Sequence, residues 1–279
     1  MNIFKTFILM FGLLLLMMFI GRLIGGAQGM TLFFLIGLGI NFISYWFSDT
    51  IVLKIYGAKH VTEQELPRVY KIVKALILKA QMPMPKIYLM DSPVPNAFAT
   101  GRNPEHAAVA VTRGILDILD EKELTGVLGH ELSHVLNRDI LISTIAAAIA
   151  GAISMLSRSA LWFGGGRNDR EEGGNPLVLI LLAILAPLAA MIIQMAISRS
   201  REYAADDSGA RLTGMPLSLA SALKKLESGV RAHPDNSRPA TAHLFIVSPL
   251  SGKSFISLFS THPSTQDRVQ RLEAIAKGS

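Results

Sequence analysis

Residues 120–136 read DEKELTGVLGHELSHVL, and their apolar positions recur at the spacing of an α-helix. Asp120 can cap the start of this helix, with Glu123 three residues on as its capping-box partner. His130 and His134 are then one turn apart on a single face, where two imidazole nitrogens can reach one metal ion. Glu131 lies about 100° round the helix, away from the ligand direction but close enough to reach a water on that metal.

This spacing is the HExxH arrangement of zinc peptidases. A catalytic zinc site needs a third protein ligand and an open position for water. The chain has no cysteine, so the third ligand must be a histidine or a carboxylate. The extended metzincin pattern, whose third histidine would fall at position 140, is excluded because Ile140 stands there.

The best candidate for the third ligand is Glu202. It comes just after an apolar run, in the same way that His134 comes just before another apolar run. If both helices continue into a membrane as one packed hairpin, the three ligands meet just above its surface. Asp206 lies four residues on, on the same helical face, and is expected to accept the other ring N–H of a ligand histidine. The alternative is an ordinary charged face in which both carboxylates pair with Arg199 and Arg201.

The composition is typical of a membrane protein with folded parts outside the membrane. Hydrophobic residues make up 50% of the chain and charged residues 17%, against about 25% in globular domains. The mean hydropathy is +0.39, and this composition excludes disorder, collagen and coiled coil. The net charge of +6 comes without a basic cluster, so no nucleic-acid partner is predicted. The absence of cysteine excludes disulfides and thiol catalysis.

Four uncharged runs are long enough to be considered as membrane spans. We predict four parts: an N-terminal transmembrane hairpin at 1–52 (spans about 6–21 and 31–48), a cytoplasmic catalytic part at 53–139, a second transmembrane hairpin at 140–198 (spans about 140–160 and 177–198), and a second cytoplasmic catalytic part at 199–279. The first hairpin is expected to turn around Gly25–Met30. The alternatives are a cleaved signal peptide for the first run and buried core helices for the last two.

The number of spans sets the predicted orientation. Two spans precede the first polar segment and two more separate it from the second, so both polar segments lie on one side. Lys54, Lys59, Arg199 and Arg201 lie next to the membrane on that side. By the positive-inside rule this side is cytoplasmic, and the catalytic parts are expected to face the cytoplasm.

The whole chain resembles the HtpX family of bacterial membrane zinc metalloproteases, relatives of the eukaryotic prenyl-protein endoproteases. The resemblance rests on the four-span plan, on the motif at 130–134, on 202–206, on Asn96-Ala97-Phe98-Ala99, and on His262-Pro263 followed by Arg268. It implies a mainly α membrane protein with four transmembrane helices and a cytoplasmic α+β zincin-like (HExxH gluzincin) catalytic domain. It also implies a multi-pass protein of the bacterial inner membrane that cleaves misfolded or damaged membrane proteins in stress-related envelope quality control.

Two of these motifs have a physical interpretation. Ile87–Met90 and Ala107–Thr112 are predicted strands that flank the Asn96–Ala99 segment. An exposed edge there can hold an extended peptide by main-chain hydrogen bonds, and the resemblance suggests that this segment does so. The other motif supplies His262 and Arg268 as donors to the oxyanion of a tetrahedral intermediate. The plainer alternatives are a turn before a strand, a helix start and a surface ion pair.

The expected enzyme is a zinc-dependent endopeptidase with one Zn²⁺ per chain, held by His130, His134 and Glu202, and with Glu131 as general base. Its expected partners are membrane-protein or unfolded polypeptide substrates and the lipid bilayer, while the oligomeric state is not predicted. One alternative is a non-catalytic zinc-binding membrane scaffold or chaperone, whose closed site would need four ligands. Another is a transporter or channel, which should carry ionisable residues within its spans, where only Arg158 comes close.

Overall fold

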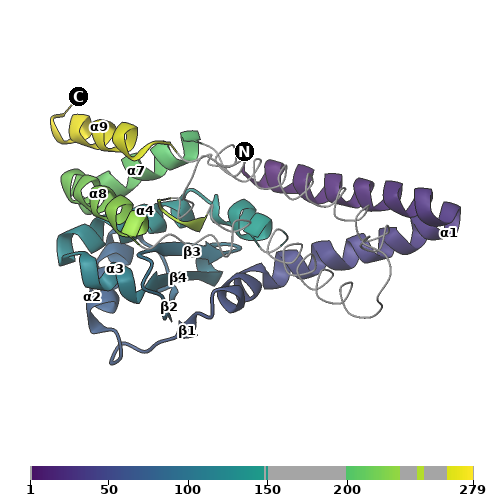
Figure 1. The fold of residues 1–279 in the computed structure, drawn as a ribbon, viewed down its shortest axis with the longest axis horizontal. Helices are drawn as coiled ribbons and strands as arrows, with labels where there is room; N and C mark the ends of the chain where they lie inside the picture. The colour runs from purple at the N-terminus through teal and green to yellow at the C-terminus, as the bar shows by residue number, and fades with distance from the viewer. Residues whose placement is uncertain (1, 148, 150–198, 233–243, 248–262, 279) are drawn as a thin grey trace, which may run out of the picture.

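The structure is a computed structural model that describes residues 2–147, 149, 199–232, 244–247 and 263–278. It begins with helix α1 (Asn2–Ile55), whose two arms project away from the rest of the chain (Figure 1). Gly25 and Gly26 leave the helical conformation, the second with φ of +59°, so the chain reverses there, at the start of the expected turn segment. The arms approach closely at Gly21, where an added Cβ would clash with the carbonyl oxygen of Gly29.

The surface of α1 suits a membrane. Its second arm, Gly25–Ile55, is long and apolar enough to cross a bilayer, whereas the apolar part of the first arm, Thr6–Phe19, is shorter. Large side chains such as Phe42 point outward, with 60% of its surface exposed. The described residues therefore contain one clear candidate span. The helix that begins at Ile140 is described only to residue 149, and most of the region expected to hold spans three and four lies outside the described residues.

A four-stranded sheet follows α1, with the order β1-β2-β4-β3. Its strands are β1 (Lys59–His60), β2 (Lys86–Met90), β3 (Ala97–Gly101) and β4 (Ala107–Thr112). Strands β2 and β4 are parallel, and the other two pairs are antiparallel. The two strands predicted from sequence are confirmed, and the segment between them forms β3 at the sheet edge.

The remaining helices surround this sheet, and several of them share one apolar core with it. They are α2 (Pro67–Ala80), the short 3₁₀ turn η1 (Pro104–His106), α3 (Arg113–Ile118), α4 (Glu121–Leu136), α7 (Arg199–Thr213), α8 (Pro216–Ala232) and α9 (Thr265–Ala276). Val109 of β4, Leu128 of α4 and Leu223 of α8 have no exposed surface and belong to this core. Helix α4 lies between the sheet and the helices α7 and α8 (Figure 1), and its buried side chains belong to the same core.

The start of α4 is held by the predicted capping box. Asp120 accepts a hydrogen bond from the backbone N–H of Glu123 at 2.9 Å, and Glu123 accepts one from the backbone N–H of Asp120 at 3.0 Å. The Glu123 carboxylate also accepts bonds from Ser221 and Lys225 of α8, both at 2.7 Å. The cap therefore fixes α4 both along its own axis and against its neighbour.

Helix α7 packs directly on α4 because Gly209 allows a close backbone approach. A Cβ added at Gly209 would lie 2.9 Å from the backbone of His130, closer than real side chains pack. Glu202 precedes Gly209 by about two helical turns on the same face. This glycine contact thus sets the distance between the HExxH motif of α4 and the carboxylate of α7.

Candidate metal centre

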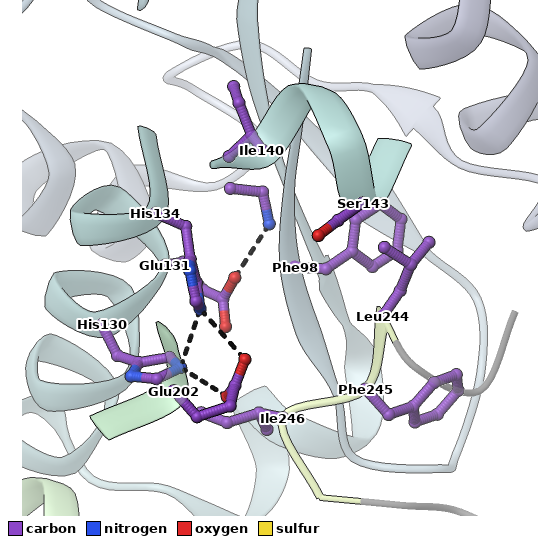
Figure 2. A pocket seen from close by; sticks show the side chains of 11 residues that line it. Phe98, His130, Glu131, His134, Ile140, Ser143, Glu202, Leu244, Phe245 and Ile246 are labelled. Atoms are coloured by element: carbon purple, nitrogen blue, oxygen red, sulfur yellow. Dashed lines mark hydrogen bonds and ion pairs between the residues drawn. The ribbon is translucent and has the colours of Figure 1, made fainter. Parts of the chain in front are cut away.

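Three side chains from two helices converge in one pocket (Figure 2). The Nε2 atoms of His130 and His134 are 3.2 Å apart. The Glu202 carboxylate lies 3.6 Å from Nε2 of His130 and 3.7 Å from Nε2 of His134. One ligand atom from each residue fits within a separation of 4.8 Å, so the three groups can reach a single metal ion. The structure brings together the three ligands expected from sequence.

Each histidine has a carboxylate behind it that determines which ring nitrogen faces the pocket. Nδ1 of His130 lies 3.0 Å from Oδ1 of Asp206, the contact expected for that residue from its helical spacing. Nδ1 of His134 lies 3.1 Å from Oδ1 of Asp139. Both carboxylates are buried, and they leave the two Nε2 atoms free to face the centre of the site.

Asp139 is a site residue that sequence reasoning missed. The end of α4 brings it back to the site: Arg138 takes a left-handed conformation with φ of +54°, and the Asp139 N–H donates to the carbonyl of His134 at 3.1 Å. The available signal is an acidic residue five positions after the second histidine, immediately before an apolar run. On sequence alone it marks only the end of a polar segment.

We expect Asp139→Asn to weaken zinc affinity by about 10–100-fold, because the amide no longer holds the His134 ring by a charged contact. Zinc titration against a competing chelator measures the change. Any activity that depends on the bound metal should fall at limiting zinc and recover at saturating zinc. Asp117→Asn, which alters an exposed carboxylate on α3, is the matched control. Equal zinc affinity in wild type and Asp139→Asn would refute the assigned role.

The electrostatics of the site favour a cation. Burial lowers the pKa of His134, but the carboxylates of Asp139 and Glu202 outweigh this and raise that pKa to about 9. Burial and Arg268 lower the pKa of His130, and the carboxylates of Asp206 and Glu202 again raise it overall. Several buried carboxylates thus surround two imidazoles, so positive charge is stabilised between them. A divalent metal ion satisfies this requirement, and the donor set fits one.

Glu131 lines the same pocket beside the two histidines (Figure 2). Its Oε2 accepts a hydrogen bond from the backbone N–H of Ala99 at 2.9 Å. Burial raises the pKa of Glu131 above its ordinary value, and the neighbouring histidines oppose this effect. A carboxylate with a raised pKa in a pocket is suited to taking and returning a proton.

Arg268 is buried behind the site instead of lining the pocket. Its Nε and Nη2 donate to the two oxygens of Asp206 at 2.8 and 2.7 Å, and its Nη1 donates to the carbonyl of Ile246 at 2.9 Å. These contacts place Arg268 against Asp206 and Ile246, and the oxyanion role expected for it from sequence stays a prediction. His262 lies outside the described residues, and its oxyanion role stays a prediction.

Strand β3 differs from the expected exposed edge. It is the edge strand by pairing, yet all of its residues are buried. The N–H of Ala99 is taken by Glu131, and the N–H of Gly101 donates to Thr144 at 3.3 Å. The edge is covered because α4 and the helix that begins at Ile140 pack against it.

The Asn96–Ala99 segment divides between the pocket and the interior. Phe98 and Ala99 line the pocket, while Ala97 has no exposed surface. The side-chain oxygen of Asn96 accepts a hydrogen bond from the N–H of Ile246 at 3.3 Å. Substrate binding by this segment stays a prediction.

The rest of the pocket lining is mostly apolar and was not foreseen. It contains Ile140, Leu244, Phe245 and Ile246, together with Ser143. The segment 244–247 carries no motif, lies more than a hundred residues from the HExxH helix in sequence, and offers no signal by which sequence reasoning would find it.

Comparison with known proteins identifies the family. The profile of peptidase family M48 matches residues 63–276, which includes α4, α7 and α9. The chain belongs to peptidase family M48. Two relatives named "Protease HtpX homolog" are similar over nearly their full length: that of Thermodesulfovibrio yellowstonii is 57% identical over 99% of both chains, and that of Pyrococcus furiosus is 55% identical over 98% of this chain and 95% of its own.

The fold of this M48 chain is also found in a solved structure. It resembles the crystal structure of Ste24p from S. mikatae with a TM-score of 0.50 and 19% sequence identity, over 91% of this chain and 60% of Ste24p. The family and the relatives make the chain a metalloendopeptidase, a hydrolase with a metal cofactor. Its apolar helix α1 indicates a membrane protein. The expected class of enzyme is confirmed, and a non-catalytic scaffold is not favoured.

Proposed function

We propose that this M48 peptidase is a zinc-dependent endopeptidase of the bacterial inner membrane, with its active site facing the cytoplasm. The observation that carries the proposal is the convergence of His130, His134 and Glu202 within 4.8 Å, in a pocket that Glu131 also lines. Three ligands leave a fourth tetrahedral position open, as in catalytic zinc sites, whereas a structural site would be closed by four.

The proposed ligands are His130, His134 and Glu202, for one ion per chain. Two imidazole nitrogens and one carboxylate are a donor set that suits zinc. When bound, zinc supplies a Lewis acid that polarises the scissile carbonyl and makes a water more acidic. Asp206 and Asp139 keep the Nε2 atoms of the two histidines directed at this position.

Glu131 is the proposed general base. One of its oxygens is held by the Ala99 N–H, which leaves the other to take a proton from the attacking water. A C–O bond then forms at the scissile carbonyl carbon, the C–N bond breaks, and Glu131 returns the proton to the leaving amine. The products are a new carboxyl terminus and a new amino terminus. His262 is the proposed oxyanion donor, while Arg268 supports the site from behind through Asp206.

The proposed substrates are misfolded or damaged membrane proteins, as part of envelope quality control. The full-length similarity to proteins named "Protease HtpX homolog" supports this proposal. The apolar helical arms of α1 support it as well, because they would place the pocket near the bilayer surface. We propose four spans with both catalytic parts on the cytoplasmic side.

The test of this function is whether cleavage depends on zinc and on Glu131 together. Metal-stripped protein should regain cleavage of an unfolded polypeptide when zinc is added, whereas Glu131→Gln should bind zinc without cleaving. Wild-type protein that binds zinc and cleaves neither itself nor an unfolded polypeptide would instead support a scaffold.

The proposed topology predicts opposite accessibility for two single cysteines in this cysteine-free chain. Lys122→Cys, on the exposed side of α4, should resist a membrane-impermeant maleimide in intact spheroplasts and react in inverted vesicles. Asn168→Cys, between the third and fourth expected spans, should do the reverse. Detergent-solubilised protein, in which both should react, is the control. Labelling of both cysteines from the same side would contradict the second transmembrane hairpin.

A further inference from the structure

Ile246 is held by its main chain from two directions. Its N–H donates to the side-chain oxygen of Asn96 at 3.3 Å, and its carbonyl accepts a hydrogen bond from Nη1 of Arg268 at 2.9 Å. Asn96 precedes β3, and Arg268 belongs to α9, so residues from two distant parts of the chain hold one residue of the segment 244–247.

Both holding residues are themselves fixed. Arg268 is 1% exposed and makes two hydrogen bonds to Asp206, the carboxylate behind His130. Asn96 is also 1% exposed, and its backbone N–H donates to the hydroxyl of Thr112 at 2.9 Å. The main chain of Ile246 is therefore connected through buried polar groups to the metal ligand on one side and to the sheet on the other.

With its main chain held in this way, Ile246 contributes to the apolar wall of the catalytic pocket. Figure 2 shows its side chain beside Glu202, with Phe98 and Leu244 further along the same cavity. Ile246 is 4% exposed and also packs into the main core, so its position is defined by packing as well as by hydrogen bonds. An apolar wall beside a proposed metal ligand, in the pocket that the proposed base also lines, is suited to accepting an apolar side chain adjacent to the scissile bond.

We propose that Ile246 determines cleavage specificity by forming the wall of a subsite for an apolar substrate side chain next to the scissile bond. The proposal rests on the endopeptidase function proposed above. The effect on specificity is steric, because the volume of the side chain at position 246 limits the size of the substrate side chain that the pocket accepts. Asn96 and Arg268 are positioning residues in this scheme, since they hold the wall without touching the substrate.

The test changes the volume at position 246 in both directions. Ile246→Ala enlarges the subsite and should move preference at one flanking position toward larger residues such as Phe, while Ile246→Phe should move it toward smaller ones such as Ala. The expected change in relative kcat/KM is about tenfold or more, as for single-methylene differences in an apolar pocket. The full-length protein in detergent is given a proteome-derived peptide library, and cleavage sites are determined by mass spectrometry.

Several variants separate specificity from stability. Val247→Ala alters the adjacent residue, which packs on the core and does not line the pocket. The cleavage-site preference of this variant should equal that of the wild type. Ile246→Val should shift preference in the same direction as Ile246→Ala by a smaller amount, which keeps the test valid if Ile246→Phe does not fold. Bound zinc is measured for every variant.

Opposite shifts in the Ala and Phe variants, with zinc retained, would support the proposal, because simple destabilisation lowers all cleavage rates together. An unchanged preference in zinc-loaded Ile246→Ala and Ile246→Val would overturn it while leaving the endopeptidase function intact. Failure of the proposed function would give a different result. Either the wild type would not cleave the library, or Glu131→Gln would still cleave it.

Discussion

Replacing Glu131 with Gln is expected to abolish peptide cleavage while one zinc ion per chain stays bound. The amide is nearly the same size as the carboxylate and keeps an oxygen that can accept the Ala99 N–H, so the pocket keeps its shape. It cannot take a proton from the attacking water. Loss of a general base costs about 10²–10⁴-fold in rate, so cleavage should fall to background.

The measurement is a paired one on wild type and Glu131→Gln, both purified in detergent under chelation and then given zinc. Bound zinc and cleavage of an unfolded polypeptide are followed in the same samples. Glu121→Gln is the matched control, because Glu121 lies on the exposed side of the same helix and pairs only with Lys71 among the described residues. Cleavage that persists in Glu131→Gln would contradict the proposed mechanism.

Replacing Glu202 with Gln is expected to remove both bound zinc and activity. Glu202 supplies the only carboxylate of the three converging ligands, and its charge offsets that of the cation. Loss of a direct ligand should weaken zinc binding by more than the about 10–100-fold expected when a residue behind a ligand, such as Asp139, is changed. Activity should therefore stay low at zinc concentrations that restore Asp139→Asn.

The two effects are compared by zinc titration with a competing chelator, with cleavage measured at each zinc concentration. Asp207→Asn is the control, since it removes a carboxylate from the same helix that pairs with Arg211 away from the site. Wild-type zinc affinity in Glu202→Gln would show that another residue completes the site. The HExxH histidines and Glu131 would then keep their proposed roles.

Local signals along the chain were sufficient for much of this structure. The capping box of Asp120 and Glu123 marks where α4 begins, and the spacing of its apolar residues marks its buried face. Because a helix places residues i and i+4 on one face, the spacing of His130 and His134 specifies a two-nitrogen site before any tertiary contact is known. The strands β2 and β4 could likewise be predicted, because the sequence patterns typical of strands involve neighbouring residues.

The remainder depended on contacts between distant parts of the chain. No pattern in the sequence shows that α4 and the helix from Ile140 would cover the edge of β3, because covering an edge depends on how whole elements pack. Nor does it show that Asn96 and Arg268 would hold Ile246. Periodicity and capping act over a few residues, so the sequence by itself determined the helix that carries His130 and His134 and pointed to Glu202 as a candidate third ligand. The carboxylate behind His134 depended on the turn that ends α4, a local feature that no pattern in the sequence marks. The walls of the pocket were decided only by the tertiary structure, which brings distant side chains together and buries their polar groups in pairs.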